Sequence, residues 1–208
     1  MIESSTSMIE VEQSGAVCFI RLNRPDALNA FRPEMLDELS RLLGLIENDL
    51  SIVVVIFEGK GKAFSAGVDL KVLQGIDPKG GKVGDLFDEP ARVAYTAIRD
   101  CRCPVIAKVH GACFTGALEM ALHCDFVLTT VDTKFGDTHA KFGLRPTWGM
   151  TQTLSQAVGI RRAKELSYTA RTFLGAEAVE LGIANQALET REDLDRVTLD
   201  CAESIAGN

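Results

Sequence analysis

Two apolar periodicities alternate along the chain and predict strands interleaved with helices. Residues 32–48 carry leucine, isoleucine and methionine at spacings of three and four, as on one face of an amphipathic helix. Residues 52–57 form an uninterrupted run of mostly β-branched residues, which is typical of a strand buried on both faces. Because a long crossover joins the first strands to this one, parallel pairing is expected, and the pattern predicts the α/β class.

The same patterns predict the remaining elements. Residues 7–11 and 16–22 alternate well enough for a hairpin. Residues 74–90 are polar and glycine-rich, so we expect a mobile surface loop there. Further strands are expected at 105–109 and 125–130, and further helices at 91–101, 116–123, 151–170, 176–181 and 191–205.

Composition limits the class of partner. The chain has 208 residues, a length that favours one domain, and a formal net charge of −7. This charge argues against nucleic acid or an anionic membrane surface as the partner, but it leaves an anionic small molecule open. No apolar stretch approaches the roughly 20 residues that a membrane span needs. Residues 1–12 lack the order of a signal peptide, so we expect a cytoplasmic protein.

Two turns that contain glycine carry the first candidate chemistry. Residues 64–70 follow one predicted buried strand, residues 110–119 follow another, and both segments open into a predicted helix. Glycine lets the backbone approach a ligand closely, and a helix start leaves unpaired N–H groups. The N–H groups of Val68 and Gly116 could therefore converge on one oxygen atom and form an oxyanion hole. The alternative is a pair of ordinary strand-to-helix turns.

The order and spacing of several motifs resemble the crotonase superfamily, the enoyl-CoA hydratase/isomerase family. No single motif decides the resemblance, but their ordered combination is specific and covers nearly the whole chain. The matching segments are residues 22–30, 63–70, 110–119 with 124–125, 135–136, 143–146 and 176–183.

The resemblance implies an architecture and a substrate. It implies a spiral of β-β-α units at residues 1–190, which would bind and transform a coenzyme A thioester. Residues 191–208 would begin a C-terminal helical oligomerisation region that is incomplete here, because family members usually continue through further helices. It also implies a homotrimer or homohexamer and no cofactor beyond the coenzyme A of the substrate.

Glu119 and His139 are the candidate acid–base residues. Glu119 matches the family's first catalytic glutamate, three residues after Gly116, and could activate water. His139 stands where hydratases of the family usually carry a second glutamate, and it could orient water or protonate carbon. The alternatives are a surface glutamate and a histidine that caps a helix beginning near Asp137. Asp137 itself is either a substitute acid or a helix N-cap.

Other positions are assigned to coenzyme A by the resemblance alone. Lys71 and Arg24 are either phosphate partners or solvated surface charges, and Trp148 either narrows the acyl pocket or fills the core. The resemblance places Ala27 and Leu28 beside the pantetheine, and Ala66, Asp69 and Leu70 around the adenine.

A metal site is not expected. Six cysteines lie mostly in apolar runs without a C-x-x-C pair, which favours reduced, buried thiols over a zinc site or a disulfide framework. Glu119 and His123 share a helix face at a spacing of four, but no third ligand is evident.

The leading hypothesis is an enoyl-CoA hydratase. A double-bond isomerase or another crotonase reaction stays open, because a site with one carboxylate also suits a proton shuttle between carbons. A non-catalytic acyl-CoA binder stays open because His139 replaces the second glutamate. The sequence has neither a P-loop nor a G-x-S-x-G elbow, which excludes the motif-bearing nucleotide triphosphatases and serine hydrolases.

Overall fold

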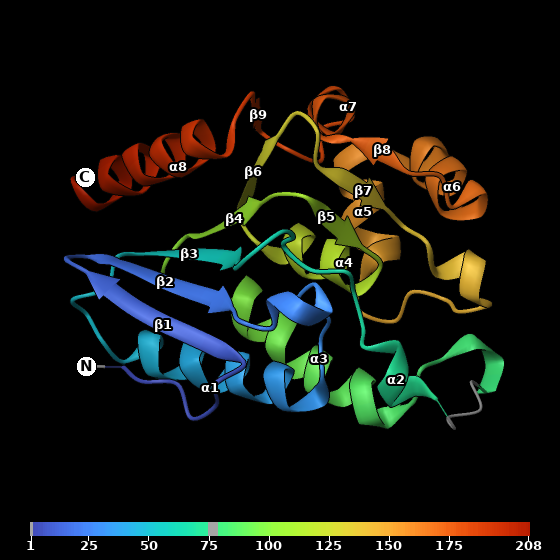
Figure 1. Cartoon of the computed structure of the whole chain (residues 1–208), viewed down its shortest axis with the longest axis horizontal. Helices are drawn as coiled ribbons and strands as arrows, with labels where there is room; N and C mark the ends of the chain where they lie inside the picture. Colours follow the sequence, from blue (N-terminus) through green and yellow to red (C-terminus); the bar gives the residue numbers. More distant parts are fainter. Residues whose placement is uncertain (1, 75–78) are drawn as a thin grey trace.

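Six strands form the larger of two sheets, in the order β1-β2-β3-β4-β6-β9 (Figure 1). In this computed structural model, residues 2–74 and 79–208 are described. β1 and β2 pair as an antiparallel hairpin, and every later pairing in this sheet is parallel. The strands are β1 (Ile9–Ser14), β2 (Val17–Leu22), β3 (Val54–Gly59), β4 (Val105–Val109), β6 (Phe126–Thr130) and β9 (Gln186–Leu188).

Helices cover both faces of this sheet, which explains the continuous apolar run of β3. α1 (Pro33–Glu47) and α3 (Asp85–Arg99) pack together on one face, and α8 (Arg191–Ala206) lies on the other (Figure 1). Side chains of β3 point alternately to the two faces, so Val55 joins the main core and Ile56 joins a smaller core under α8. All six residues of β3 are buried.

A second, smaller sheet stands beside the end of the first. It has the order β5-β7-β8, and the bridge between Ser65 and Cys113 connects its first strand to the turn after β3. Its strands are β5 (Ala112–Phe114), β7 (Lys134–Gly136) and β8 (Phe173–Leu174). The nearby helices are α4 (Gly116–His123), α5 (Met150–Val158), α6 (Ile160–Thr169) and α7 (Gly175–Glu180). Four short segments complete the chain: η1 (Pro25–Ala27), α2 (Leu70–Leu73), η2 (Lys79–Gly81) and η3 (His139–Phe142).

Most predicted elements are confirmed, with two corrections. The single helix expected at 151–170 is two helices, because Gly159 has a φ of +78° and interrupts the helix between α5 and α6. The loop expected at 74–90 ends early, because α3 begins at Asp85 and tolerates Pro90 in its second turn. Residues 75–78 of that prediction lie outside the described part of the chain.

A buried ion-pair cluster joins α8 to the sheet. Lys108 on β4 pairs with Glu58 on β3, and its Nζ atom lies 2.6 Å from Oδ1 of Asp195 on α8. Arg21 on β2 approaches the same Glu58 carboxylate at 2.6 Å. The Lys108 and Glu58 side chains are only 8% and 6% exposed, so removing either partner would leave a buried charge with less compensation.

The sequence also predicted reduced thiols and no membrane span. The six cysteines are all free, and four of them are buried. Among residues 2–74 and 79–208, no helix has the length and apolar character required to cross a bilayer.

Candidate active site

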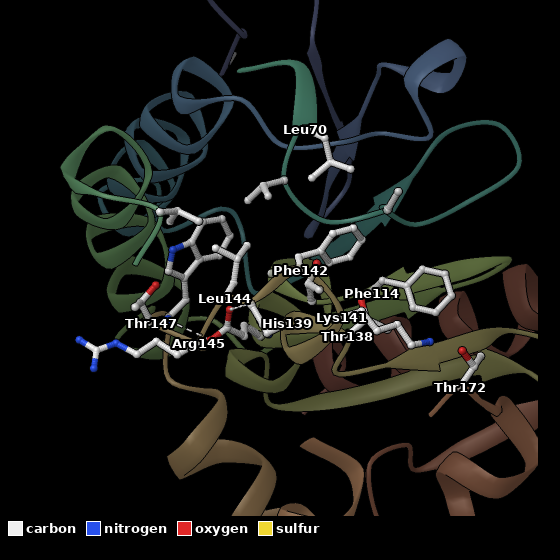
Figure 2. Close-up of a pocket in the computed structure, with 17 residues that line it drawn as sticks. Leu70, Phe114, Thr138, His139, Lys141, Phe142, Leu144, Arg145, Thr147 and Thr172 are labelled. Carbon is white, nitrogen blue, oxygen red and sulfur yellow. Dashed lines mark hydrogen bonds and ion pairs between the residues drawn. The ribbon is translucent and has the colours of Figure 1, made fainter. Parts of the chain in front are cut away.

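A cavity of about 290 Å³ lies between the turn after β3, the start of α4 and the segment from η3 to α5. Apolar side chains form much of its wall. In Figure 2, Leu144 and Phe142 lie beside His139, Phe114 lies farther along, and Leu70 lies across from them. Glu119, His139, Val68 and Gly116 all line this cavity, so the structure brings the four predicted catalytic residues together.

The backbone N–H groups of Val68 and Gly116 are available to a ligand. Phe31 donates to the carbonyl of Gly67 at 2.7 Å and accepts from the N–H of Asp69 at 2.9 Å, which fixes the turn on both sides of Val68. Gly116 is the first residue of α4, so its N–H has no acceptor within the helix. Within the described residues neither N–H donates a hydrogen bond, and this arrangement suits an oxyanion hole.

Glycine is required at both turns by crowding. A Cβ atom on Gly67 would lie 2.1 Å from Oγ1 of Thr115, and Gly67 has a φ of +95°. A Cβ atom on Gly116 would lie 2.5 Å from the Trp148 ring. Thr115 between the two donors has a φ of +49° and a ψ of −119°, a conformation that is strained for a residue other than glycine.

Glu119 is a buried carboxylate that is held from the opposite side of the cavity. It lies on the first turn of α4 and is 1% exposed, which excludes the alternative of a surface glutamate. Its Oε1 atom accepts hydrogen bonds from the backbone N–H groups of Trp148 at 2.9 Å and Met150 at 3.1 Å. Its Oε2 atom faces His139, so one oxygen is anchored and the other can take part in proton transfer.

His139 lies between two carboxylates. Its Nε2 atom is 3.4 Å from Oε2 of Glu119, and its Nδ1 atom is 2.7 Å from Oδ1 of Asp137. Burial alone would lower the pKa of His139, but the hydrogen bonds to Asp137 and Glu119 outweigh burial and raise it to about 9. The ring is therefore a cation at neutral pH, and both ring nitrogens carry a proton.

Asp137 has a hydrogen-bond partner that the sequence did not reveal. Burial alone would raise its pKa, but hydrogen bonds from His139 and Ser167 lower the pKa below the ordinary value, so Asp137 is ionised. Its Oδ2 atom accepts the Ser167 hydroxyl at 2.6 Å. The Asp-x-His spacing was visible in the sequence, but nothing there pointed to Ser167, which comes from α6.

Comparison with known proteins decides the family. The family model described as enoyl-CoA hydratase/isomerase matches residues 12–208. The chain belongs to the enoyl-CoA hydratase/isomerase family.

Relatives from this family match almost the full chain. A probable peroxisomal enoyl-CoA hydratase 1 of Arabidopsis thaliana is 34% identical over 98% of the chain and 75% of that protein. A peroxisomal Delta(3,5)-Delta(2,4)-dienoyl-CoA isomerase of the same plant is 31% identical over 96% of the chain and 75% of its own length. The solved enoyl-CoA hydratase of Bacillus anthracis superposes with a TM-score of 0.90 at 31% identity, covering 97% of the chain and 77% of that structure. The spiral α/β fold expected from the sequence is thereby confirmed.

The residues assigned to coenzyme A by the family resemblance are partly gathered at the cavity. Ala66 and Leu70 line it, and Ala66 donates its N–H to the carbonyl of Leu28 at 2.9 Å. Leu28 is 44% exposed, next to Ala27 at the end of η1.

Asp69 and Arg24 have partners within the protein. The Arg24 guanidinium lies 2.9 Å from Oδ2 of Asp69, and the other carboxylate oxygen of Asp69 accepts the N–H of Lys71. Arg24 is therefore part of a half-buried ion pair rather than a fully solvated surface charge, and its role as a phosphate partner stays a prediction.

Trp148 packs in the core and also lines the cavity. Its ring packs near Phe31 and Phe87, with centroid separations of 6.3 and 6.5 Å, and it also lines the cavity. The indole N–H donates to Oδ1 of Asp88 at 3.2 Å, and the Thr147 hydroxyl donates to the same oxygen at 2.7 Å.

His123 bonds to the backbone and stacks on a neighbouring ring. Its Nε2 atom donates to the carbonyl of Trp148 at 2.7 Å, and its ring stacks on Tyr95 at 4.4 Å. In the part of the chain that is described, no three His, Cys, Asp or Glu side chains are grouped closely enough to hold a metal ion.

Proposed function

We propose that this protein is an enoyl-CoA hydratase that adds water across the 2,3 double bond of an acyl-CoA thioester. One observation carries the proposal. Oε2 of the Glu119 carboxylate and Nε2 of the protonated His139 imidazole lie 3.4 Å apart. Val68 and Gly116, whose N–H groups donate to no acceptor among the described residues, line the same cavity. Hydration needs a base for water, an acid for carbon and donors for the developing enolate, and this set supplies all three.

The reaction then runs in two balanced steps. As the water oxygen bonds to C3, Oε2 of Glu119 takes a proton from water, and the electrons of the double bond move toward the thioester oxygen. The N–H groups of Val68 and Gly116 stabilise that enolate oxygen, and in other enzymes the loss of one such donor costs about 2.7–4 kcal/mol. The Nε2–H of His139 then protonates C2, which completes the addition of water.

The site can be restored without bulk solvent. After the addition Glu119 is protonated and His139 is neutral. The two groups lie close enough for a proton to return from the carboxyl group to the imidazole, directly or through one water molecule. The cation of His139 thus supplies the proton that a second carboxylic acid would otherwise supply.

The substrate class follows from the family names and the apolar wall of the cavity. The acyl chain would pack against Leu144, Phe142 and Trp148. Coenzyme A is part of the substrate, and we infer that no separate cofactor takes part. Assembly as a homotrimer or homohexamer and a cytoplasmic location stay predictions, for which light scattering and fractionation are the direct measurements.

The decisive experiment is hydration of crotonyl-CoA, followed by loss of the enoyl-thioester absorbance. We expect Glu119→Gln and His139→Ala each to lower kcat by about 10²–10⁴ while thioester binding persists. Gln keeps an oxygen for the Trp148 and Met150 N–H groups, so that variant removes the base with little change of shape. Glu192→Gln, on α8, is the matched control and should keep full activity. Full activity of Glu119→Gln would remove this carboxylate from the mechanism.

One observation also favours an isomerase. The single carboxylate–imidazole pair can move a proton between two carbons, and a dienoyl-CoA isomerase is among the relatives. Equilibration of a 3-enoyl-CoA without hydration of the 2-enoyl product would favour this second function. Tight thioester binding without turnover of either substrate would identify a non-catalytic binder.

A further inference from the structure

We propose that Asp137 is a positioning residue that, held in turn by Ser167, fixes the His139 ring with its Nε2–H toward Glu119 and the substrate. The inference rests on the proposed function, in which His139 protonates carbon. The reaction would then depend on Asp137 and on Ser167, which lies on a different helix, although neither residue touches the substrate.

The geometry fixes the Asp137 carboxylate at both oxygens. Oδ1 lies 2.7 Å from Nδ1 of His139, and Oδ2 accepts the Ser167 hydroxyl at 2.6 Å. Asp137 is 1% exposed, so water does not compete for these bonds. Ser167 lies on α6, which packs against η3, so the tertiary contact between two helices sets the plane of the carboxylate and therefore the plane of the ring.

The orientation of the ring has a direct chemical result. Because Nδ1–H is bonded to Asp137, Nε2 is the ring nitrogen left to face Glu119 at 3.4 Å. An imidazole whose Nδ1–H is held by a buried carboxylate has one defined tautomer and a stabilised cation. The same contacts hold the pKa of His139 at about 9 despite its burial.

No cation among the described side chains opposes this charge directly. The charged groups on the surrounding elements are Glu119 on α4, Asp137 beside η3, and Lys141 and Arg145 on the cavity wall. In Figure 2, the Lys141 and Arg145 side chains extend away from the ring to opposite sides of the view. On α6, Glu165 is paired with Arg162 and Arg171, while Ser167 is the residue that meets Asp137.

A purely local role for Asp137 is the competing explanation. Asp137 Oδ1 also accepts the backbone N–H of His139, at 3.4 Å, as an N-cap of η3 would. That bond is much longer than the 2.7 Å contact with the ring. Asparagine is as good a cap as aspartate, so replacing the charge separates the two roles.

The test compares Asp137→Asn and Ser167→Ala with wild type in the pH dependence of kcat. We expect Asp137→Asn to lower kcat at least tenfold at pH 8, to move the alkaline limb at least one pH unit lower, and to leave KM within about threefold. A one-unit displacement corresponds to a tenfold change in proton affinity. Ser167→Ala keeps the charge, so we expect a smaller loss of kcat and a smaller displacement in the same direction.

Asp132→Asn is the matched control, because Asp132 accepts the Thr130 hydroxyl in the turn before β7, outside the cavity. Its profile should coincide with wild type. Wild-type kcat and an unmoved alkaline limb in folded Asp137→Asn, or in Ser167→Ala should Asp137→Asn not fold, would overturn the inference.

A second readout separates this inference from the proposed function. Titration of ¹⁵N-labelled histidine by NMR, with His139 assigned through His139→Gln, follows the ring without any turnover. A lower His139 pKa in Asp137→Asn or Ser167→Ala supports the positioning role even if crotonyl-CoA proves not to be a substrate. An unchanged titration in both variants contradicts the role even if hydration is confirmed.

Discussion

The backbone N–H of Trp148 donates to Oε1 of Glu119 at 2.9 Å, so the residue whose side chain walls the cavity also anchors the proposed base. Side chain and backbone thus have separable tasks at one position. The indole packs against Gly116 and lines the cavity, whereas the peptide group contacts the carboxylate. Changes of the side chain can therefore alter substrate choice while the base stays in place.

Replacing Trp148 with leucine should favour longer acyl chains. The smaller side chain enlarges the cavity, and each methylene that a pocket newly accommodates is worth about 1–3 kcal/mol of selectivity. We expect the ratio of kcat/KM for an eight-carbon over a four-carbon 2-enoyl-CoA to rise at least tenfold. Trp148→Phe keeps a ring and should change the ratio much less. An unchanged ratio in Trp148→Leu would show that the chain lies elsewhere.

The alkaline limit of activity should report His139. The ring must be protonated to give its proton to carbon, and its pKa is about 9, so kcat should fall as pH rises through about 9. The check is a kcat profile from pH 6 to 10 for wild type. A plateau that continues past pH 10 would contradict an acid of this pKa.

The free energy of unfolding should decrease with rising pH as His139 loses its proton. The folded-state pKa of His139 is raised above its ordinary value of about 6.5, so the stabilisation is complete below pH 6.5 and is lost as pH rises toward about 9. Urea unfolding of wild type and His139→Gln at pH 6, 7.5 and 9 measures it. The difference in free energy of unfolding should shrink steadily with pH, and a difference that grows would be the wrong sign.

Gly67→Ala should damage both stability and turnover. The new Cβ would lie 2.1 Å from Oγ1 of Thr115 in a backbone with a φ of +95°. We expect a loss of about 1–3 kcal/mol from crowding, and a decrease in kcat of about 10²–10³ if the Val68 N–H moves. Gly15→Ala is the control, because Gly15 also has a positive φ, +59°, but has open space around it. It should cost about 1–2 kcal/mol and leave kcat unchanged.

Lys108→Met should loosen α8 from the sheet. The substitution leaves the buried Glu58 carboxylate with Arg21 at 2.6 Å and Arg191 at 4.0 Å, and breaking a buried pair in this way typically costs about 3–5 kcal/mol. Arg92→Met breaks a pair with Glu89 whose side chains are 55% and 59% exposed, so solvent screens the pair and the substitution should change stability little. Urea midpoints measure both. Equal, small effects would mean that Lys108 contributes little to the attachment.

The order of strands and helices was largely predictable from the sequence because burial imposes a strict periodicity. The run at β3 is apolar at every position since helices cover both faces of the sheet, and the limits of α4 came out as predicted. The failures were at single residues. Gly159 interrupts an otherwise helical pattern, and α3 includes Pro90 in its second turn, although a proline there removes one intrahelical N–H bond.

The site was predictable as a set of residues but not as a set of contacts. Glu119 and His139 were found through the family resemblance, and nothing in the sequence reported that they face each other across one cavity. The hydrogen bond of Asp137 with Ser167 joins the segment between β7 and η3 to α6 and has no periodic signal in the sequence. The ion pair of Arg24 with Asp69 depends equally on tertiary structure, so its phosphate role could not be judged beforehand.

The proposed oxyanion donors belong to two turns that separate strands bring together. Val68 follows β3, and Gly116 begins the helix after β5, so neither turn alone forms the site. A thioester that accepts from both N–H groups would bind only when both turns are folded and in place, and would not bind a partly unfolded form. Its binding free energy therefore adds to global stability. Slowly exchanging amides of β3, β4 and α4 should become slower still when a substrate analogue is bound, although most of them never touch it.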